Sequence, residues 1–215
     1  MNMISHAAAI ALFAFTIAAG GVAQAATVYD ETTSGDFSSN GATPNPLAFG
    51  LGDNQIFGVT GRSVEGVVDR DYFTFTLSSG FALTAVQVLP GTTSIGGGSL
   101  SFIGMESGSQ MTVLPTAANA AGLLGWRHYG PADINTDILD DMAIPAAGSS
   151  GFKTPLGPGS YSVWIQETAT GTAKYGLNFH VAAVPEPAVW AMMIVGFGMV
   201  GAAMRQSRVS VRLAG

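Results

Sequence analysis

The chain has 215 residues, enough for one domain with a core of its own after removal of targeting segments. Only 10% of its residues are charged, its net charge is −6, and it contains 29 glycines and no cysteine. The acidic balance argues against nucleic-acid binding, because it repels the phosphate backbone. The absence of cysteine excludes disulfides, thiol nucleophiles and cysteine-bound metals, and the glycine-rich, charge-poor composition favours short strands joined by turns.

The amino end has the features of a secretory signal peptide. Residues 7–19 form an apolar run of the right length, and Ala23-Gln24-Ala25 supplies the small-x-small pattern of a cleavage site. No lysine or arginine precedes the run, which leaves the terminal amine and His6 as the positive groups. We expect residues 1–25 to form a signal helix that is removed after Ala25, so that the chain is exported.

Residues 26–54 are rich in Thr, Ser, Gly, Asn and Pro and predict mostly irregular structure, with one short strand at 27–30. From residue 55 the hydrophobic pattern has a period of two, as in Phe73, Phe75 and Leu77, which is typical of half-buried strands. We expect strands at 55–58, 71–77, 81–89, 99–103, 110–114, 161–166 and 175–181, with a short helix at 117–124.

This spacing of short strands predicts an all-β fold, an antiparallel, jelly-roll-like β-sandwich over residues 55–183. Its inner face is expected to carry residues that alternate along single strands, namely Phe73, Phe75, Leu77, Val163, Ile165, Leu177 and Phe179. The weakly patterned interval 115–158 is long for a loop.

Two stretches of this body resemble bacterial pre-peptidase C-terminal domains, which are small sandwiches on exported proteins. One is the sequence VDRDYFTFTL at 68–77 with the Ser-Ser-Gly that follows, and the other is LGPGSYSVWI at 156–165 with Tyr175-Gly-Leu177. The Asp-x-Asp-Leu stretch of that family is missing, so the resemblance supports the fold and gives no support to a metal role.

At the carboxyl end, Pro185-Glu186-Pro187 precedes an uncharged run, Ala188 to Met204, and Arg205, Arg208 and Arg212 follow it. We expect 188–204 to be a transmembrane helix, with Trp190 at the outer interface and the arginines on the cytoplasmic side. The two prolines hold Glu186 in an extended segment beside the membrane.

Residues 184–215 resemble the PEP-CTERM sorting signal of Gram-negative bacteria, in its alphaproteobacterial form. The resemblance rests on the Pro-Glu-Pro motif, on WAMMIVGFG from Trp190 and on the arginines Arg205 and Arg208, although these basic residues are spaced out rather than consecutive. It implies recognition by an exosortase, a membrane-embedded transpeptidase-like enzyme that releases the chain near Pro-Glu-Pro. The alternative is a simple membrane anchor behind a proline linker.

An enzyme is not expected. Outside the signal only His128 and His180 are available as bases, and no G-x-S-x-G motif is present. Catalytic residues are therefore predicted to be absent, and no cofactor is expected apart from calcium.

Two groups of oxygen-bearing side chains are candidates for calcium. One is Asp133, Asn135 and Asp137, which alternate as in a calcium loop without being an EF-hand, and the other is Asp69 with Asp71. Turn chemistry is the alternative, because Asp and Asn side chains accept hydrogen bonds from loop amides.

Trp126 and Tyr129, next to His128, are a candidate carbohydrate platform, since flat aromatic rings stack on sugars. The alternative is a small satellite core.

Together these features favour an exported structural or adhesive protein of the cell surface or exopolysaccharide matrix. The alternative function is a carbohydrate- or calcium-binding module. The expected partners are an exosortase, the membrane during sorting and extracellular polysaccharide.

Overall fold

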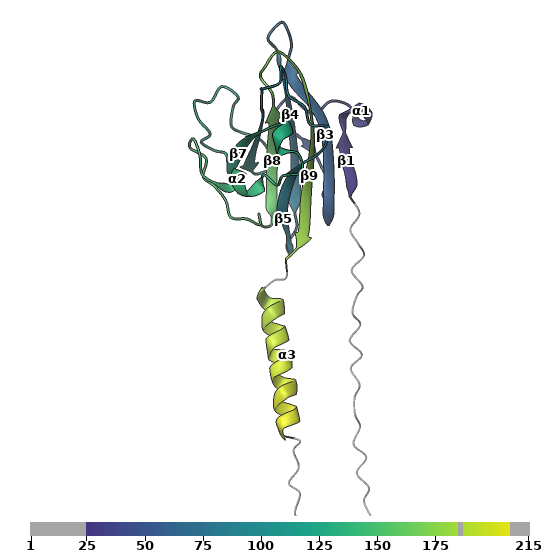
Figure 1. Ribbon diagram of the computed structural model, residues 1–215. Coiled ribbons are helices and arrows are strands. Elements are labelled where there is room, and N and C mark those ends of the chain that lie inside the picture. The colour runs from purple at the N-terminus through teal and green to yellow at the C-terminus, as the bar shows by residue number, and fades with distance from the viewer. Residues whose placement is uncertain (1–24, 185–186, 207–215) are drawn as a thin grey trace, which may run out of the picture.

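The computed structural model describes residues 25–184 and 187–206. The described part is mostly β, with short helical elements between the strands and one longer helix at its end (Figure 1). The strands are β1 (Ala26–Asp30), β2 (Asn45–Pro46), β3 (Gly52–Arg62), β4 (Val68–Leu77), β5 (Phe81–Val88), β6 (Ser101–Ser107), β7 (Gly125–Tyr129), β8 (Gly159–Gln166) and β9 (Gly171–Ala183). The helical elements are α1 (Glu31–Ser34), η1 (Pro131–Asp133), α2 (Leu139–Ala143) and α3 (Pro187–Gln206).

The strands form a nearly closed, largely antiparallel sheet in the order β5-β9-β3-β4-β8-β6-β7. The short strands β1 and β2 are added in parallel, β1 beside β3 and β2 beside β4. Strands β3 and β4 pair only next to their hairpin, at Gly61 with Asp69 and Arg62 with Val68, so the sheet turns there from one layer to the other. The prediction of an antiparallel β domain is confirmed.

The core lies between the two layers and contains the side chains that the period-two pattern places there. Phe73, Phe75, Leu77, Val163, Ile165, Leu177 and Phe179 are all buried, as predicted. The Phe179 ring lies at the centre of an aromatic group, with centroid distances of 5.3, 5.7 and 5.9 Å to Phe49, Phe73 and Phe75. Burial of these rings, together with the aliphatic side chains around them, stabilises the domain.

The outer face of β4 and β8 is also covered, which the alternating pattern did not predict. Tyr72 and Trp164 on that face are buried under the loop that follows β6, together with Met111, Val113 and Leu123. The carboxylate of the buried Glu106 orders this loop, because its Oε2 accepts hydrogen bonds from the amides of Thr112 (2.7 Å) and Val113 (3.2 Å).

Two predicted elements are therefore wrong. Residues 110–114 and 117–124 are loop in the structure, whereas residues 125–129, expected to be irregular, form β7 against β6. The apolar residues of 110–114 reflect packing of a loop onto the sheet, not strand pairing. The segment 26–54, expected to be mostly irregular, contributes β1, α1, β2 and the start of β3.

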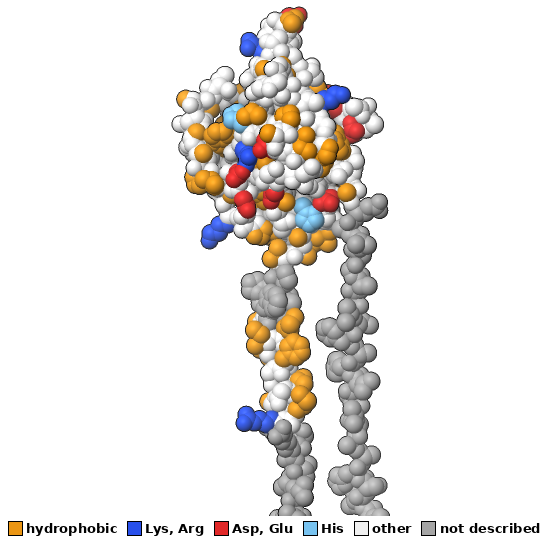
Figure 2. Space-filling view, in the orientation of Figure 1, with side chains coloured by type: hydrophobic (Ala, Val, Ile, Leu, Met, Phe, Trp, Pro, Cys, Tyr) orange, Lys and Arg blue, Asp and Glu red, His pale blue; other side chains and the backbone are white. Residues whose placement is uncertain are grey.

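Helix α3 extends away from the β domain, and its apolar side chains are exposed (Figures 1 and 2). Met192, Ile194 and Phe197 are 70–74% exposed. Within the described residues, no helix combines the length and apolarity that a membrane crossing requires, so the transmembrane prediction for 188–204 is not supported by the structure. The predicted signal helix lies outside the described residues.

Candidate functional site

The β domain ends directly before the predicted sorting motif. The amide of Val184 donates a 2.7 Å hydrogen bond to the carbonyl of Gly80, and α3 begins at Pro187. Pro185 and Glu186 lie outside the described residues. The hydrogen bonds of the described β domain therefore extend to Val184, directly before the Pro-Glu-Pro motif in the sequence.

Other predicted targeting residues are placed as follows. Trp190 lies in the first turn of α3, and Arg205 is exposed in its last turn. Ala25 is exposed immediately before β1. Ala23 and Arg208 lie outside the described residues.

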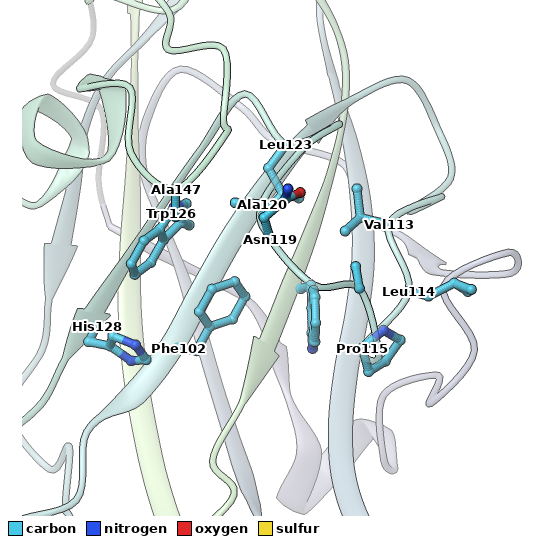
Figure 3. Close-up of a pocket in the computed structure, with 12 residues that line it drawn as sticks. Phe102, Val113, Leu114, Pro115, Asn119, Ala120, Leu123, Trp126, His128 and Ala147 are labelled. Carbon is cyan, nitrogen blue, oxygen red and sulfur yellow. The ribbon is translucent and has the colours of Figure 1, made fainter.

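An apolar pocket of about 230 Å³ lies on the outer face of β6, β7 and β8, beneath the covering loop (Figure 3). Strand pairing builds it, because Gly104 of β6 lies opposite both Trp126 of β7 and Trp164 of β8. A Cβ at Gly104 would lie 2.9 Å from the Phe102 ring and 3.1 Å from Leu123. The glycine therefore makes room for the aromatic side chains around it.

The rings that line the pocket are held in fixed orientations. Phe102 stacks on Trp126 at a centroid distance of 6.0 Å and meets Trp164 edge-on at 4.9 Å. Trp126 Nε1 donates to the carbonyl of Ala146 at 3.0 Å, whereas the buried Nε1 of Trp164 has no hydrogen-bond partner among residues 25–184 and 187–206. His128 is exposed at the margin of the pocket and contacts Trp126 edge-on. Such a surface can hold the flat apolar face of a sugar ring.

Tyr129, predicted to share a carbohydrate platform with Trp126, does not lie in this pocket. Its side chain points to the other face of β7 and is fully buried in the main core. Alternation along β7 separates the two residues, because 126 and 128 face outward and 129 faces inward. Trp126 instead packs against Phe102 and lines the same pocket as Trp164, and no local sequence pattern joins these residues.

Asp133, Asn135 and Asp137, the first predicted calcium group, have structural roles in their loop. Asp133 forms an ion pair with Arg127 (2.9 Å) and accepts from the amide of Gly130. Asp137 Oδ1 accepts hydrogen bonds from the amides of Val86 and Leu139, both at 2.9 Å. Asn135 has a φ of 64°, a conformation that asparagine tolerates. The contacts of Asp133 and Asp137 are those of turn chemistry, and the calcium prediction for this group stays a prediction.

A different acidic cluster, Glu31, Asp36 and Asp71, lies where the N-terminal segment meets β3 and β4. One carboxylate oxygen from each lies within 4.8 Å of the others. Glu31 is placed by two backbone amides, since Oε1 accepts from Phe37 (3.2 Å) and Oε2 from Val59 (2.7 Å). Of the predicted pair, Asp71 belongs to this cluster and Asp69 lies near it.

Asp71 is fully buried at the end of the core. Its Oδ2 accepts a 2.7 Å hydrogen bond from the hydroxyl of Tyr175, and its Oδ1 has no partner among the described residues. Burial, reinforced by the charge of Glu31, raises the pKa of Asp71 to about 9. Burial also raises the pKa of Glu31 to about 7, against the opposing effect of its two amide donors.

The two described histidines lie in different places, His128 beside the apolar pocket and His180 in a polar network on β9. His180 Nδ1 lies 2.6 Å from Asp53 Oδ1, and the amide of the Asn178 side chain donates to the same oxygen. The hydrogen bonds from Asn178 and His180 lower the pKa of Asp53. This is a partly exposed polar network on β9 and β3.

Comparison with protein-family models, curated proteins and solved structures finds no significant match to this chain.

Proposed function

We propose that the chain is an exported, non-enzymatic protein of the cell surface or extracellular matrix, and that its tail is a PEP-CTERM sorting signal processed by an exosortase. We infer further that the β domain is a jelly-roll-like sandwich with a structural or adhesive role in an exopolysaccharide environment.

The observation that carries this proposal is the position at which the folded domain ends. The hydrogen bond from Val184 to Gly80 closes the β domain one residue before Pro185. Cleavage near Pro-Glu-Pro would therefore leave the sheet and its core intact. A sorting enzyme needs this arrangement, because its recognition peptide must be separable from the domain that it delivers.

The exposed apolar surface of α3 supports the same proposal. Met192, Ile194 and Phe197 are exposed on the helix, which Figure 2 shows extending from the β domain with hydrophobic side chains on its surface, and Arg205 lies in its last turn. Apolar side chains exposed on this scale are unfavourable in water. We infer that the membrane and the exosortase cover the helix during sorting.

Substitutions in the motif test the sorting proposal. The chain is produced in an exosortase-bearing host as wild type, Pro187→Ala and Glu186→Gln, with Glu65→Gln as the matched control. Glu65 is exposed in the β3–β4 hairpin, so its loss changes charge without touching the tail. We expect both motif variants to accumulate as full-length, membrane-retained chains and the control to mature.

The expected block has a local cause. Pro187 restrains the preceding residue from helical geometry, so alanine would allow α3 to extend towards Pro185 and hide the peptide. Glutamine keeps the shape of Glu186 but removes a charge that an enzyme can pair. Normal maturation of both variants would contradict the sorting proposal.

Carbohydrate binding is a second candidate function, favoured by the pocket around Trp126. Rings from three neighbouring strands form it, and the indole of Trp126 is fixed by its bond to Ala146. Binding of the purified chain to the producer's own exopolysaccharide should be lost in Trp126→Ala and kept in Val64→Ala, a control with an exposed side chain. Equal binding by both variants would exclude the pocket.

A further inference from the structure

The acidic cluster has no positive partner in the described part of the chain. The ion pairs found there join Arg127 to Asp133 and Asp141, and His180 to Asp53. None of them involves Glu31, Asp36 or Asp71. Three carboxylates whose oxygens lie within 4.8 Å of one another repel each other unless protons or a cation lie between them.

Asp71 supplies a second observation, independent of the number of acidic residues. Its side chain is fully buried, yet its Oδ1 has no hydrogen-bond partner among the described residues. A buried carboxylate oxygen without a partner is strongly unfavourable, and in native proteins a bound ion, an ordered water or a proton satisfies such a group. The hydrogen bond from Tyr175 fixes the carboxyl group while leaving this oxygen available.

A solvent-filled pocket borders the cluster on the side of Asp36. A pocket of about 590 Å³ lies between the β3–β4 hairpin and the turn before β9, and Asp36 and Asp69 both line it. Arg62 also lines this pocket, and its guanidinium lies beside Gly66 at the hairpin. Asp36 is exposed, so an ion and its water ligands can reach the cluster from this side.

The donor atoms select a hard divalent cation. All three are carboxylate oxygens, which Ca²⁺ binds at about 2.3–2.6 Å in irregular geometry, so two of its ligands can be about 5 Å apart. Mg²⁺ requires shorter bonds of about 2.0–2.1 Å and near-octahedral geometry, which three side chains from separate segments meet less readily.

We propose that Glu31, Asp36 and Asp71 bind one Ca²⁺ ion, with water completing its coordination. The ion links Glu31 and Asp36, which follow β1, to Asp71 in β4. It thereby fastens the N-terminal segment of the mature chain to the β domain. This site is independent of the sorting proposal, since none of its residues lies in the tail.

Calorimetric titration and thermal unfolding of the full chain in detergent, after removal of metal with EDTA, test the site. We expect one Ca²⁺ bound per chain and a melting temperature that rises with Ca²⁺ concentration. Asp36→Asn should abolish both effects. Because Asp36 is exposed, this variant is expected to fold.

Two controls locate the ion. Glu65→Gln removes an exposed carboxylate of the β3–β4 hairpin that is not part of the cluster, and this variant should bind as wild type does. Asp137→Asn tests the loop at residues 133–137. Its melting temperature without metal can differ from that of wild type, but Ca²⁺ should still raise it. The proposal is overturned if wild type shows no shift, if Asp36→Asn responds as wild type does, or if the response follows Asp137 instead. An equal response to Mg²⁺ at the same concentration would overturn the assignment to calcium.

Discussion

Phe179→Ala tests the register and the core of the β domain. The side chain is fully buried, and its ring contacts three other phenylalanine rings at centroid distances of 5.3–5.9 Å. Removing a buried phenylalanine side chain costs about 3–5 kcal/mol, because burial is lost and a cavity remains. For a domain of this size, that loss lowers the melting temperature by about 6–20 °C.

The assay is urea unfolding of the purified chain followed by tryptophan fluorescence. If the free energy of unfolding falls by about 2 kcal/mol per molar urea, the urea concentration at the unfolding midpoint should be about 2 M lower for Phe179→Ala than for wild type. Val64→Ala is the control, since Val64 is 85% exposed and its truncation should change stability by less than about 0.5 kcal/mol. Equal midpoints for the two variants would refute the packing, since a one-residue slip of β9 would turn Phe179 outward.

Three further predictions concern the same domain. Gly58→Ala should destabilise it by about 1–3 kcal/mol in urea unfolding, because a Cβ there would lie 2.3 Å from the hydroxyl of Tyr175; wild-type stability would contradict the close approach. Leu123→Ala should lower the free energy of unfolding by about 2–5 kcal/mol in the same assay, because Leu123 is buried where the loop after β6 packs on the sheet. An unchanged free energy of unfolding would mean that the loop does not pack there. Without metal, stability should fall as pH rises from about 7 to 9, by up to about 1.4 kcal/mol per pH unit, because the pKa of Asp71 is raised to about 9 on folding and the folded state therefore holds a proton that the unfolded state releases. Glu31, whose pKa is raised to about 7, adds to the slope only below that range. Asp71→Asn should flatten the slope between about pH 7 and 9 in urea unfolding, and an unchanged slope there would refute its origin.

The period-two pattern predicted the strands with a buried face well. Phe73 and Phe75 in β4, and Leu177 and Phe179 in β9, alternate with polar or small residues, and this alternation alone places them in the core. The same reasoning failed for Trp164, whose face of β8 is covered by a loop. No local pattern shows that a distant loop will pack on a sheet.

The candidate sites were harder to predict, because they depend on pairing between distant segments. Glu31 and Asp71 lie far apart in the sequence and meet because β1 pairs with β3 in parallel, which sets Glu31 beside Val59. The sequence showed Asp69 and Asp71 as a pair, but alternation along β4 does not reveal a third carboxylate from another segment. Likewise, the sequence analysis identified Trp126 as a candidate binding residue but not Phe102 and Trp164, which line the same pocket.

Mass spectrometry of the chain recovered from the surface and matrix fractions of an exosortase-bearing host tests the central proposal most directly. We predict a mature chain that begins at Ala26, keeps the β domain through Val184 and ends near Pro185-Glu186-Pro187. Recovery of a chain from these fractions that still carries the residues after Arg205 would contradict it, and the tail would then be an anchor.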